Sequence, residues 1–175
     1  MTRRLGFWSL VAGLLLLWPA PAARAVEIPL RKAGLWEMRM VRSGSPLPDM
    51  TMQHCTDETT DKAMSAALSP VSRQACSSND IRQTATGYVT DSVCSVAGLS
   101  MTSHSEISGD LNSAYTVKTT THAEHGATGH DLSMTVAAKW LGACKPGQKP
   151  GDIVMPGGFK LNIRDAERLK GLLPK

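Results

Sequence analysis

Aromatic residues are scarce in this chain, where only eight of 175 residues are Trp, Tyr or Phe. A core filled mainly by large rings is therefore excluded, because aromatic side chains normally supply much of the buried area of a core. The sequence also lacks the Gly-x-Ser-x-Gly and His-Glu-x-x-His motifs, a phosphate-binding glycine loop and a dinucleotide fingerprint. No apolar run reaches the roughly 20 residues of a membrane-spanning helix. These absences count against the common enzyme classes and against a membrane span.

What the chain contains is the composition of an ordinary globular protein. Hydrophobic residues make up 42% of it and the mean hydropathy is −0.14, which excludes collagen-like and fully disordered classes. Its length suits one domain, since single domains most often have about 100–150 residues.

Residues 1–25 have the pattern of a secretory signal peptide. Arg3 and Arg4 form a positive start, and an apolar stretch of about 13 residues follows. The sequence Ala-Arg-Ala then ends at Ala25 and matches the small-x-small pattern of a cleavage site. We therefore expect cleavage after Ala25 and a periplasmic or secreted protein. The remaining chain divides into a β-rich domain at residues 26–144 and a Pro/Gly-rich strap with a short basic amphipathic helix at residues 145–175.

The net charge of +4 comes from 19 Lys and Arg against 15 Asp and Glu. Removal of the signal peptide takes away three arginines and no acid, which leaves a net charge of +1. Residues 139–175 alone carry a net charge of +5, so the excess of positive charge lies in the tail. A nearly neutral domain with a solvated basic tail gives no reason to expect a nucleic-acid partner.

All four cysteines lie in the exported part of the chain. An even number of cysteines in an exported protein of this size indicates two disulfides. No Cys-x-x-Cys pair exists, so a metal site built on thiolates is disfavoured. The cysteines expected to pair are Cys55, Cys76, Cys94 and Cys144.

A hairpin between the second and third cysteines suggests how they pair. Two strand-like runs separate Cys76 from Cys94, and a three-residue loop at residues 84–86 would place these cysteines directly opposite each other. A bulge at Gly87 would shift the register by about two residues but keep both on one face. We therefore expect a bridge between Cys76 and Cys94, which leaves the first and last cysteines to form the second bridge.

Alternation of apolar and polar residues, the pattern of a half-buried strand, dominates the rest of the chain. Short turns separate the strands, which favours antiparallel pairing of neighbours. The fold class expected is mainly β, as a curved antiparallel meander sheet or a partly open barrel. The clearest alternating segments are residues 36–40, 50–54, 99–107, 115–120 and 132–140.

Two short helices are expected beside this sheet. After the second strand, Thr56 is a candidate N-cap, the acidic pair Asp57-Glu58 suits the first turn, and Pro70 ends the segment. Near the C-terminus, Asn162 is a candidate cap for an amphipathic helix that we expect to pack on the sheet.

Several short motifs occur in order: Gly34-Leu35-Trp36-Glu37, Cys55-Thr56, the Cys76…Gly87…Cys94 hairpin and Trp140-Leu141-Gly142-Ala143-Cys144 followed by Lys-Pro-Gly. In this order they resemble the exported bacterial proteins of domain-of-unknown-function family 3617. The resemblance covers about residues 33–158 and implies a small periplasmic β-rich protein with paired cysteines, with no assigned activity and no catalytic residue. Two features depart from the family pattern: the Met-Pro repeats are reduced to residues 46–50, and Asp57 stands where a Pro is common.

A histidine-rich segment is the sharpest candidate for a binding site. It brings the imidazoles of His122, His125 and His130 close in sequence to the carboxylates of Glu124 and Asp131. These groups are ligands of Zn²⁺ and Cu²⁺, and two glycines would let a loop here fold back. A metal site and a solvated loop with scattered histidines are the two interpretations.

A strand with two methionines and a histidine offers a second metal hypothesis. Met50, Met52 and His54 share one face, and thioether ligands select Cu(I). The competing interpretation is that these methionines fill gaps in a core that has few aromatic residues.

The function favoured by the sequence is a non-enzymatic binding or envelope-associated protein, stapled by disulfides. The alternative is a periplasmic Zn or Cu protein that uses the histidine-rich loop, and a small hydrolase without a known motif is a third hypothesis. No cofactor is expected. The partner is expected to be an envelope protein or a small ligand, and the protein is expected to be a monomer.

Overall fold

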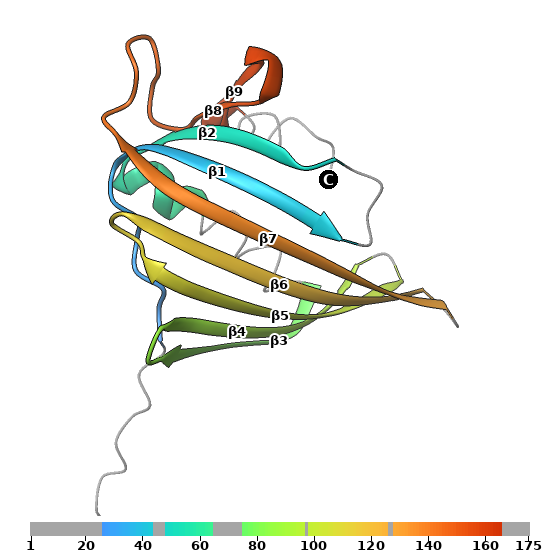
Figure 1. Ribbon diagram of the computed structural model, residues 1–175. Helices are drawn as coiled ribbons and strands as arrows, with labels where there is room; N and C mark the ends of the chain where they lie inside the picture. Colours follow the sequence, from blue (N-terminus) through green and yellow to red (C-terminus); the bar gives the residue numbers. More distant parts are fainter. Residues whose placement is uncertain (1–25, 44–47, 65–74, 97, 126–127, 166–175) are drawn as a thin grey trace, which may run out of the picture.

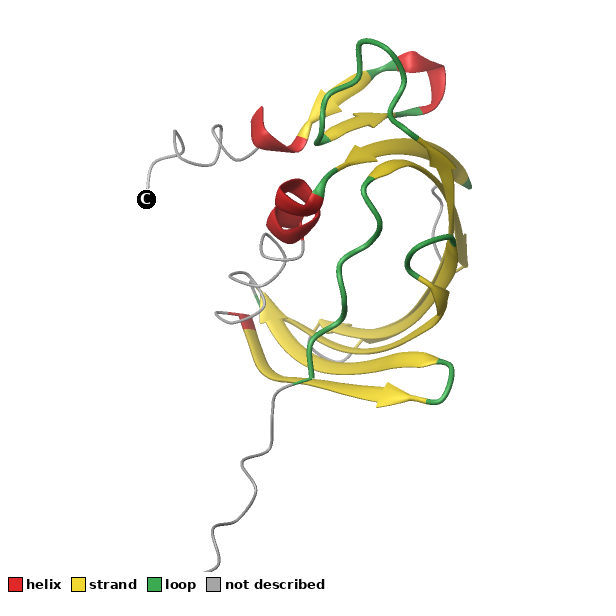
Figure 2. Ribbon diagram, turned by 90° about the vertical axis from the view of Figure 1, so that its left-hand side faces the viewer, coloured by secondary structure: helices red, strands yellow, loops and turns green. Residues whose placement is uncertain are grey.

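The computed structural model describes residues 26–43, 48–64, 75–96, 98–125 and 128–165. These residues form one antiparallel sheet of nine strands, in the order β3-β4-β5-β6-β7-β1-β2-β8-β9 (Figure 1). The sheet is strongly curved but does not close, which confirms the mainly β, partly open architecture expected from the sequence (Figure 2). The expected signal peptide lies outside the described residues.

The long strands follow the alternating segments of the sequence. The bounds are β1 Gly34–Ser43, β2 Met50–Thr56, β3 Cys76–Thr84, β4 Gly87–Val96, β5 Leu99–Asp110, β6 Ala114–His125, β7 Thr128–Gly142, β8 Asp152–Val154 and β9 Lys160–Asn162. Strands β3 to β7 form a meander that ends beside β1. Strand β1 pairs with β7 on one side and with β2 on the other. Within the described residues, no helix has the length and apolar character to cross a membrane.

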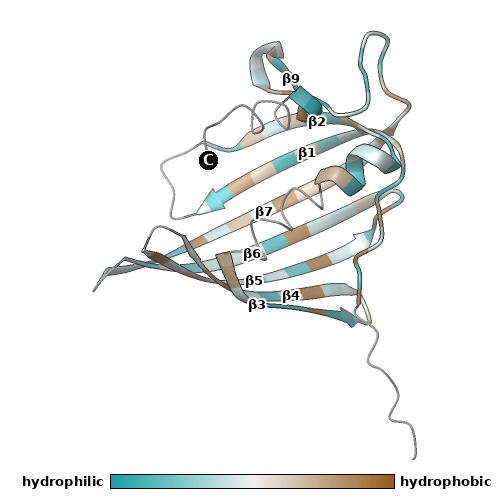
Figure 3. Cartoon of the chain, turned by 180° about the vertical axis from the view of Figure 1, so that it is seen from behind, coloured by the Kyte–Doolittle hydropathy of each residue, from teal (hydrophilic) through white to brown (hydrophobic). Residues whose placement is uncertain are grey.

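Alternation along the strands gives the sheet two different faces (Figure 3). In β5 every second side chain from Leu99 to Ile107 is partly buried and faces the inside of the curve, whereas those between them are exposed. The outer, convex face is mostly polar and includes a few exposed apolar side chains such as Val93. One face is therefore partly buried and the other is exposed to solvent, as expected for strands in which apolar and polar residues alternate.

The β3–β4 hairpin reaches the expected disulfide by a different register. Thr84 pairs with Gly87, so the loop has two residues, and the cysteines would be out of step by one position. A register shift between Cys76 and Ser78 corrects this and sets Cys76 opposite Cys94. Gly87 has a φ of 152°, and a Cβ there would overlap the carbonyl oxygen of Ile107 in β5. The close approach of β5 therefore requires glycine at this turn.

The segment expected to be an extended strap contributes to the same sheet. It contains β8, a 3₁₀ turn at Pro156–Gly158 and β9, and β8 pairs with β2 next to His54. The backbone N–H of Gly151 donates to the carbonyl of Cys55 over 2.8 Å, which fixes the approach of β8. The sheet therefore continues beyond Cys144. Asn162 accepts from the N–H of Arg164 at 3.0 Å, at the start of a helical segment described over residues 163–165. The rest of the expected amphipathic helix lies outside the described residues.

The helix after β2 lies inside the curve of the sheet and is described over residues 58–64 (Figure 2). Its N-cap is Asp57 and not Thr56, because the Asp57 carboxylate accepts from the N–H of Thr60 at 2.7 Å. Thr56 is still the last residue of β2, and its hydroxyl lies 3.1 Å from that of Thr60. The end expected at Pro70 lies outside the described residues.

The fully buried core is small and lies near one end of the concave face. Trp36 packs against Tyr115 with a ring-centre distance of 5.4 Å, and Ala138 completes this cluster. The Trp36 indole N–H donates to the carbonyl of Lys32 at 2.8 Å, and the Lys32 ammonium lies 3.6 Å from the centre of the Trp140 ring. The segment before β1 is thereby attached to the core.

Both expected disulfides are present. Cys55–Cys144 links the end of β2 to the second residue after β7 over a sequence separation of 89 residues, whereas Cys76–Cys94 spans 18 residues within a hairpin. The long bridge therefore constrains most of the chain.

Removal of the long bridge by Cys55→Ala with Cys144→Ala is expected to destabilise the fold more than removal of the short one by Cys76→Ala with Cys94→Ala. Loop-closure entropy predicts losses of about 4.5 and about 3 kcal/mol respectively. Urea denaturation of the two double variants measures the difference. Equal losses, or a larger loss for the short loop, would contradict this explanation.

Candidate functional site

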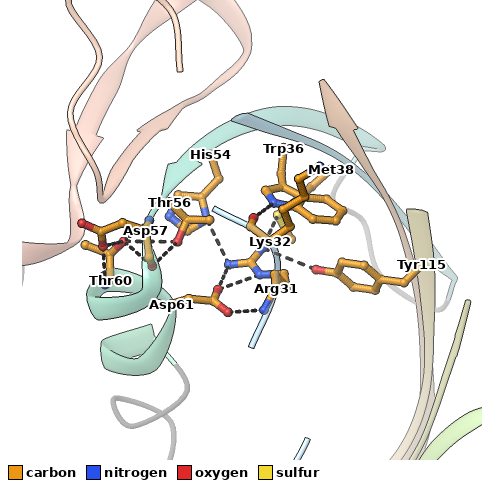
Figure 4. A network of polar contacts seen from close by, with 10 residues as sticks. All are labelled: Arg31, Lys32, Trp36, Met38, His54, Thr56, Asp57, Thr60, Asp61 and Tyr115. Carbon is orange, nitrogen blue, oxygen red and sulfur yellow. Dashed lines mark hydrogen bonds and ion pairs between the residues drawn. The ribbon is translucent and has the colours of Figure 1, made fainter. Parts of the chain in front are cut away.

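Arg31 is the centre of a polar network inside the curve of the sheet (Figure 4). Its Nε donates to Asp61 Oδ1 at 2.7 Å, and its Nη2 lies 2.5 Å from the same oxygen. The backbone N–H of Arg31 donates to Asp61 Oδ2 at 2.7 Å, so both carboxylate oxygens are used. The Asp61 side chain is only 5% exposed. This ion pair therefore joins the segment before β1 to the helix at residues 58–64.

The same guanidinium reaches the sheet. Its Nη1 donates to the Tyr115 hydroxyl of β6 at 3.4 Å, and its Nη2 lies 3.3 Å from His54 Nδ1 of β2. Burial acts to lower the pKa of Arg31, but the interactions with Tyr115 and Asp61 outweigh it and hold the pKa above its ordinary value. Arg31 therefore stays charged while it contacts three elements.

His54 is a buried neutral histidine. It is 1% exposed, and burial together with the nearby positive charge of Arg31 lowers its pKa to about 4. Because Arg31 donates to Nδ1, the ring proton belongs on Nε2, which has no hydrogen-bond partner within the described residues. Such a group resists protonation in the folded state.

Beyond this network, the concave face presents apolar side chains that the described residues only partly cover. They come from β1, β2, β5, β6 and β7, and Leu132 is still 38% exposed. Methionine is frequent among them, and its flexible, polarizable side chain adapts to ligands of different shape. The partly covered side chains are Met38, Met40, Met52, Leu99, Met101, Ile107, Val117, Leu132 and Met134.

Hydroxyl groups form a second zone on the same face, across β5 and β6. Ser103 and Thr121 lie opposite each other with their hydroxyl oxygens 2.9 Å apart, and so do Ser105 and Thr119. These pairs retain hydrogen-bonding capacity, because each hydroxyl has one donor and two acceptor sites. The concave face is therefore amphipathic, with an apolar side and a hydroxyl-bearing side.

A cavity of about 250 Å³ lies at the end of the concave face where β4 begins and β5 ends. Pro29 and Leu30 of the N-terminal segment cover it, and Tyr88, Ile107 and Leu111 supply its apolar wall. Its volume is slightly below that of a typical site for a small molecule. It adds an open hollow to this end of the partly covered face.

A larger cavity, of about 400 Å³, lies beside β8 and β9, but its buried acid is already satisfied. Asp152 accepts from Asn162 Nδ2 at 2.7 Å and from the N–H of Lys149 at 2.9 Å, and it lies 3.4 Å from Lys160. These contacts hold the β8–β9 hairpin together.

The histidine-rich segment is a hairpin and not the loop expected from the sequence. His122 pairs with Asp131, and Ala123 pairs with His130, so alternation places His122 and His130 on opposite faces of the sheet. Both ring nitrogens of His122 are bonded, Nδ1 to Asp131 at 2.7 Å and Nε2 to Glu124 at 3.0 Å. The side-chain position of His125 lies outside the description.

These carboxylates raise the pKa of His122, first through the hydrogen bond to Asp131 and then through that to Glu124. A protonated imidazole is not a metal ligand. Within the described residues, no group of three or more His, Cys, Asp or Glu side chains is placed to hold a metal ion. The three-histidine metal site stays a prediction. In the methionine-containing strand, His54 directs Nδ1 to Arg31, which leaves the Cu(I) hypothesis without support from geometry.

The sequence alone does not single out Arg31 or Asp61 as site residues. One signal was present: Asp61 lies three residues before Met64, so it belongs to the apolar side of the helix, where an acid needs a buried partner. Nothing in the sequence indicates that Arg31, 30 positions earlier, is this partner.

The family model described as "Protein of unknown function (DUF3617)" matches residues 31–144. No curated protein and no solved structure matches the chain. The matched region begins at the arginine of the buried network and ends at the last cysteine, so it contains the network and both disulfides.

Substitution Arg31→Met is expected to destabilise the protein by about 3 kcal/mol or more, because it leaves the buried Asp61 carboxylate without its partner. The double variant Arg31→Met with Asp61→Leu is expected to lose less than the single variant, since no charge is then left buried. Urea denaturation tests this, and Arg39→Met on the convex face is the control. A double variant less stable than Arg31→Met would contradict this interpretation.

The free energy of unfolding is expected to fall as the pH drops from about 6.5 to about 4. The unfolded chain binds a proton at His54 in this range while the folded chain does not, so the loss reaches about 3 kcal/mol. The pKa values of Asp57 and Asp152 are lowered from 3.8, so these groups titrate in a more acidic range. In His54→Asn this part of the slope should disappear in thermal melts; an unchanged slope would contradict the assignment.

Proposed function

The chain belongs to the DUF3617 family, whose function is unknown, and for this member we propose a binding role outside the cytoplasm. The ligand proposed is a small amphipathic molecule that occupies the concave face of the sheet. Its apolar part contacts the methionine-rich side formed by β1, β2 and β7, and its polar part contacts the hydroxyl groups of β5 and β6.

The observation that carries this proposal is the partly covered apolar surface on the concave face. A sheet normally buries its apolar face against another layer, because exposed apolar area costs about 25 cal/mol per Å². Here the buried cluster of described residues centres on Trp36, Tyr115 and Ala138, whereas side chains such as Met40 and Met134 remain partly accessible. A ligand that covers them gains hydrophobic energy without any rearrangement of the sheet.

The location outside the cytoplasm is supported by the two disulfides. Disulfides persist in the periplasm and in extracellular space, whereas the cytosol keeps thiols reduced. All four cysteines of the chain are paired, and the longer bridge contains the buried Cys55. A secreted or periplasmic protein of this kind would meet its ligand in an oxidising compartment.

Binding, and not catalysis, is the role proposed for the concave face. The polar groups of its network bond to one another: Arg31 to Asp61, His54 and Tyr115, and Asp57 to Thr60. The groups near the apolar side are hydroxyls, flexible methionines and aliphatic side chains, which suit recognition of shape and polarity.

Fluorescence of N-phenyl-1-naphthylamine, which increases in apolar surroundings, tests the proposal on the oxidised protein. The wild-type protein is expected to bind this probe, and Met134→Asp is expected to weaken binding at least about tenfold, because it places a charge in the apolar side. Displacement of the probe by laurate would show that an amphipathic chain occupies the same face.

The control is Ser133→Asp, which adds the same charge one residue away on the convex face and is expected to bind like wild type. Leu132→Asp guards against misfolding, since this concave side chain is already 38% exposed. Circular dichroism verifies that each variant is folded. If the folded wild type does not bind the probe, or if both faces respond equally, the proposal is wrong.

A further inference from the structure

The two edges of the sheet differ in length. At one edge β9 has three residues, whereas at the other edge β3 has nine (Figure 1). Within the part of the chain that the structure describes, no strand pairs with the outer side of β3. Such an edge carries a row of unpaired backbone N–H and C=O groups, which is a template for another strand.

Strand β3 lacks most of the usual protections of an edge, and its two charged residues, Asp80 and Arg82, have opposite signs. Proteins block exposed edges with lysine, proline, bulges or very short strands. Between Ser78 and Thr84 the strand contains no Lys and no Pro, and its register irregularity lies before this stretch, at residues 76–78. Seven consecutive residues are therefore available for regular pairing.

We propose that β3 pairs antiparallel with β3 of a second copy of this chain, about a two-fold axis at Ile81. The sequence Ser-Asn-Asp-Ile-Arg-Gln-Thr at residues 78–84 is complementary to itself in this arrangement. Ile81 lies opposite Ile81 of the second copy, and Asp80 lies opposite Arg82 in both directions. The amides of Asn79 and Gln83 face each other, as do the hydroxyls of the terminal serine and threonine.

Directly opposite residues of an antiparallel pair share a face of the sheet, so this register also brings side chains of matching environment together. Ile81 is partly buried, and its neighbours Asp80 and Arg82 have exposed side chains on the other face. Pairing at Ile81 therefore joins apolar to apolar and acid to base, and it joins the two concave faces into one continuous sheet. An isologous contact of this kind closes as a dimer.

The charges of a single copy leave an acid in excess at this edge. Asp80 lies directly opposite Asp91 of β4, an arrangement that is unfavourable for like charges. Arg82 is shared between them, with Nε 3.2 Å from Asp80 Oδ2 and Nη2 bonded to Asp91 Oδ2. His104 also bonds to Asp91, with Nδ1 2.6 Å from Oδ1, and this raises the pKa of His104.

The second copy brings acids and bases in the same ratio, so pairing changes their placement and not their balance. Its Arg82 would lie opposite Asp80, so that each acid of the edge has a guanidinium beside it. Exposed ion pairs contribute little to affinity, so the backbone hydrogen bonds hold the strands and the charges select the register. A second copy fits this edge better than an unrelated extended peptide, because each of its side chains already has its complement.

Sedimentation velocity of the oxidised full chain, from ~1 to ~500 µM, tests the proposal over the range of weak to moderate dimers. The wild type is expected to form a dimer as the concentration rises. Asp80→Arg places arginines opposite each other and Arg82→Asp places aspartates opposite each other, so each is expected to raise the dissociation constant at least about tenfold. The double variant Asp80→Arg with Arg82→Asp restores opposite charges and is expected to dimerise again.

Arg39→Asp is the matched control, because Arg39 is exposed in β1, away from either edge, and it pairs with Thr51 and Ala137. It should dimerise like wild type. Circular dichroism verifies folding of every variant. A wild type that stays monomeric at the highest concentration overturns the proposal, and so does a dimer that both single β3 variants leave intact.

Discussion

The buried ion pair between Arg31 and Asp61 is the interaction on which the rest of the structure depends. It joins three parts of the chain inside one curve: the segment before β1, the helix after β2, and the sheet through Tyr115 and His54. A buried ion pair contributes less to stability than its Coulomb energy suggests, because both charges lose hydration. Its consequence is geometric: one residue sets the position of the segment and helix within the concave face (Figure 4).

The core inside the curved sheet is small. Few aromatic residues are present, and the described core packs around Trp36 and Tyr115 near one end. Disulfides compensate for the small core, one within the β3–β4 hairpin and one between β2 and the segment after β7. The small core also leaves methionine side chains partly covered. The feature that limits the stability of this fold is therefore also the one that suits a ligand.

The sheet has two kinds of surface for interaction. Its concave face is apolar on one side and hydroxyl-bearing on the other, and its convex face carries charged ladders such as Arg82, Asp91 and His104. Its two outer edges also differ, because β9 is too short to recruit another strand and β3 is long. A dimer formed through β3 would extend the concave face without covering it, so ligand binding and self-association do not compete for the same surface.

The sequence alone determined the strand segments, the inward face of each strand and the disulfide partners, because alternation and cysteine spacing are local properties. Only the tertiary structure decided the one-residue correction at Ser77 in the hairpin, the addition of β8 and β9 to the sheet, and the hairpin form of the histidine-rich segment. The meeting of Arg31 with Asp61 likewise joins residues 30 positions apart, and no local pattern encodes such a distance. Pairing of charges is decided by which surfaces the folded chain brings together and removes from water.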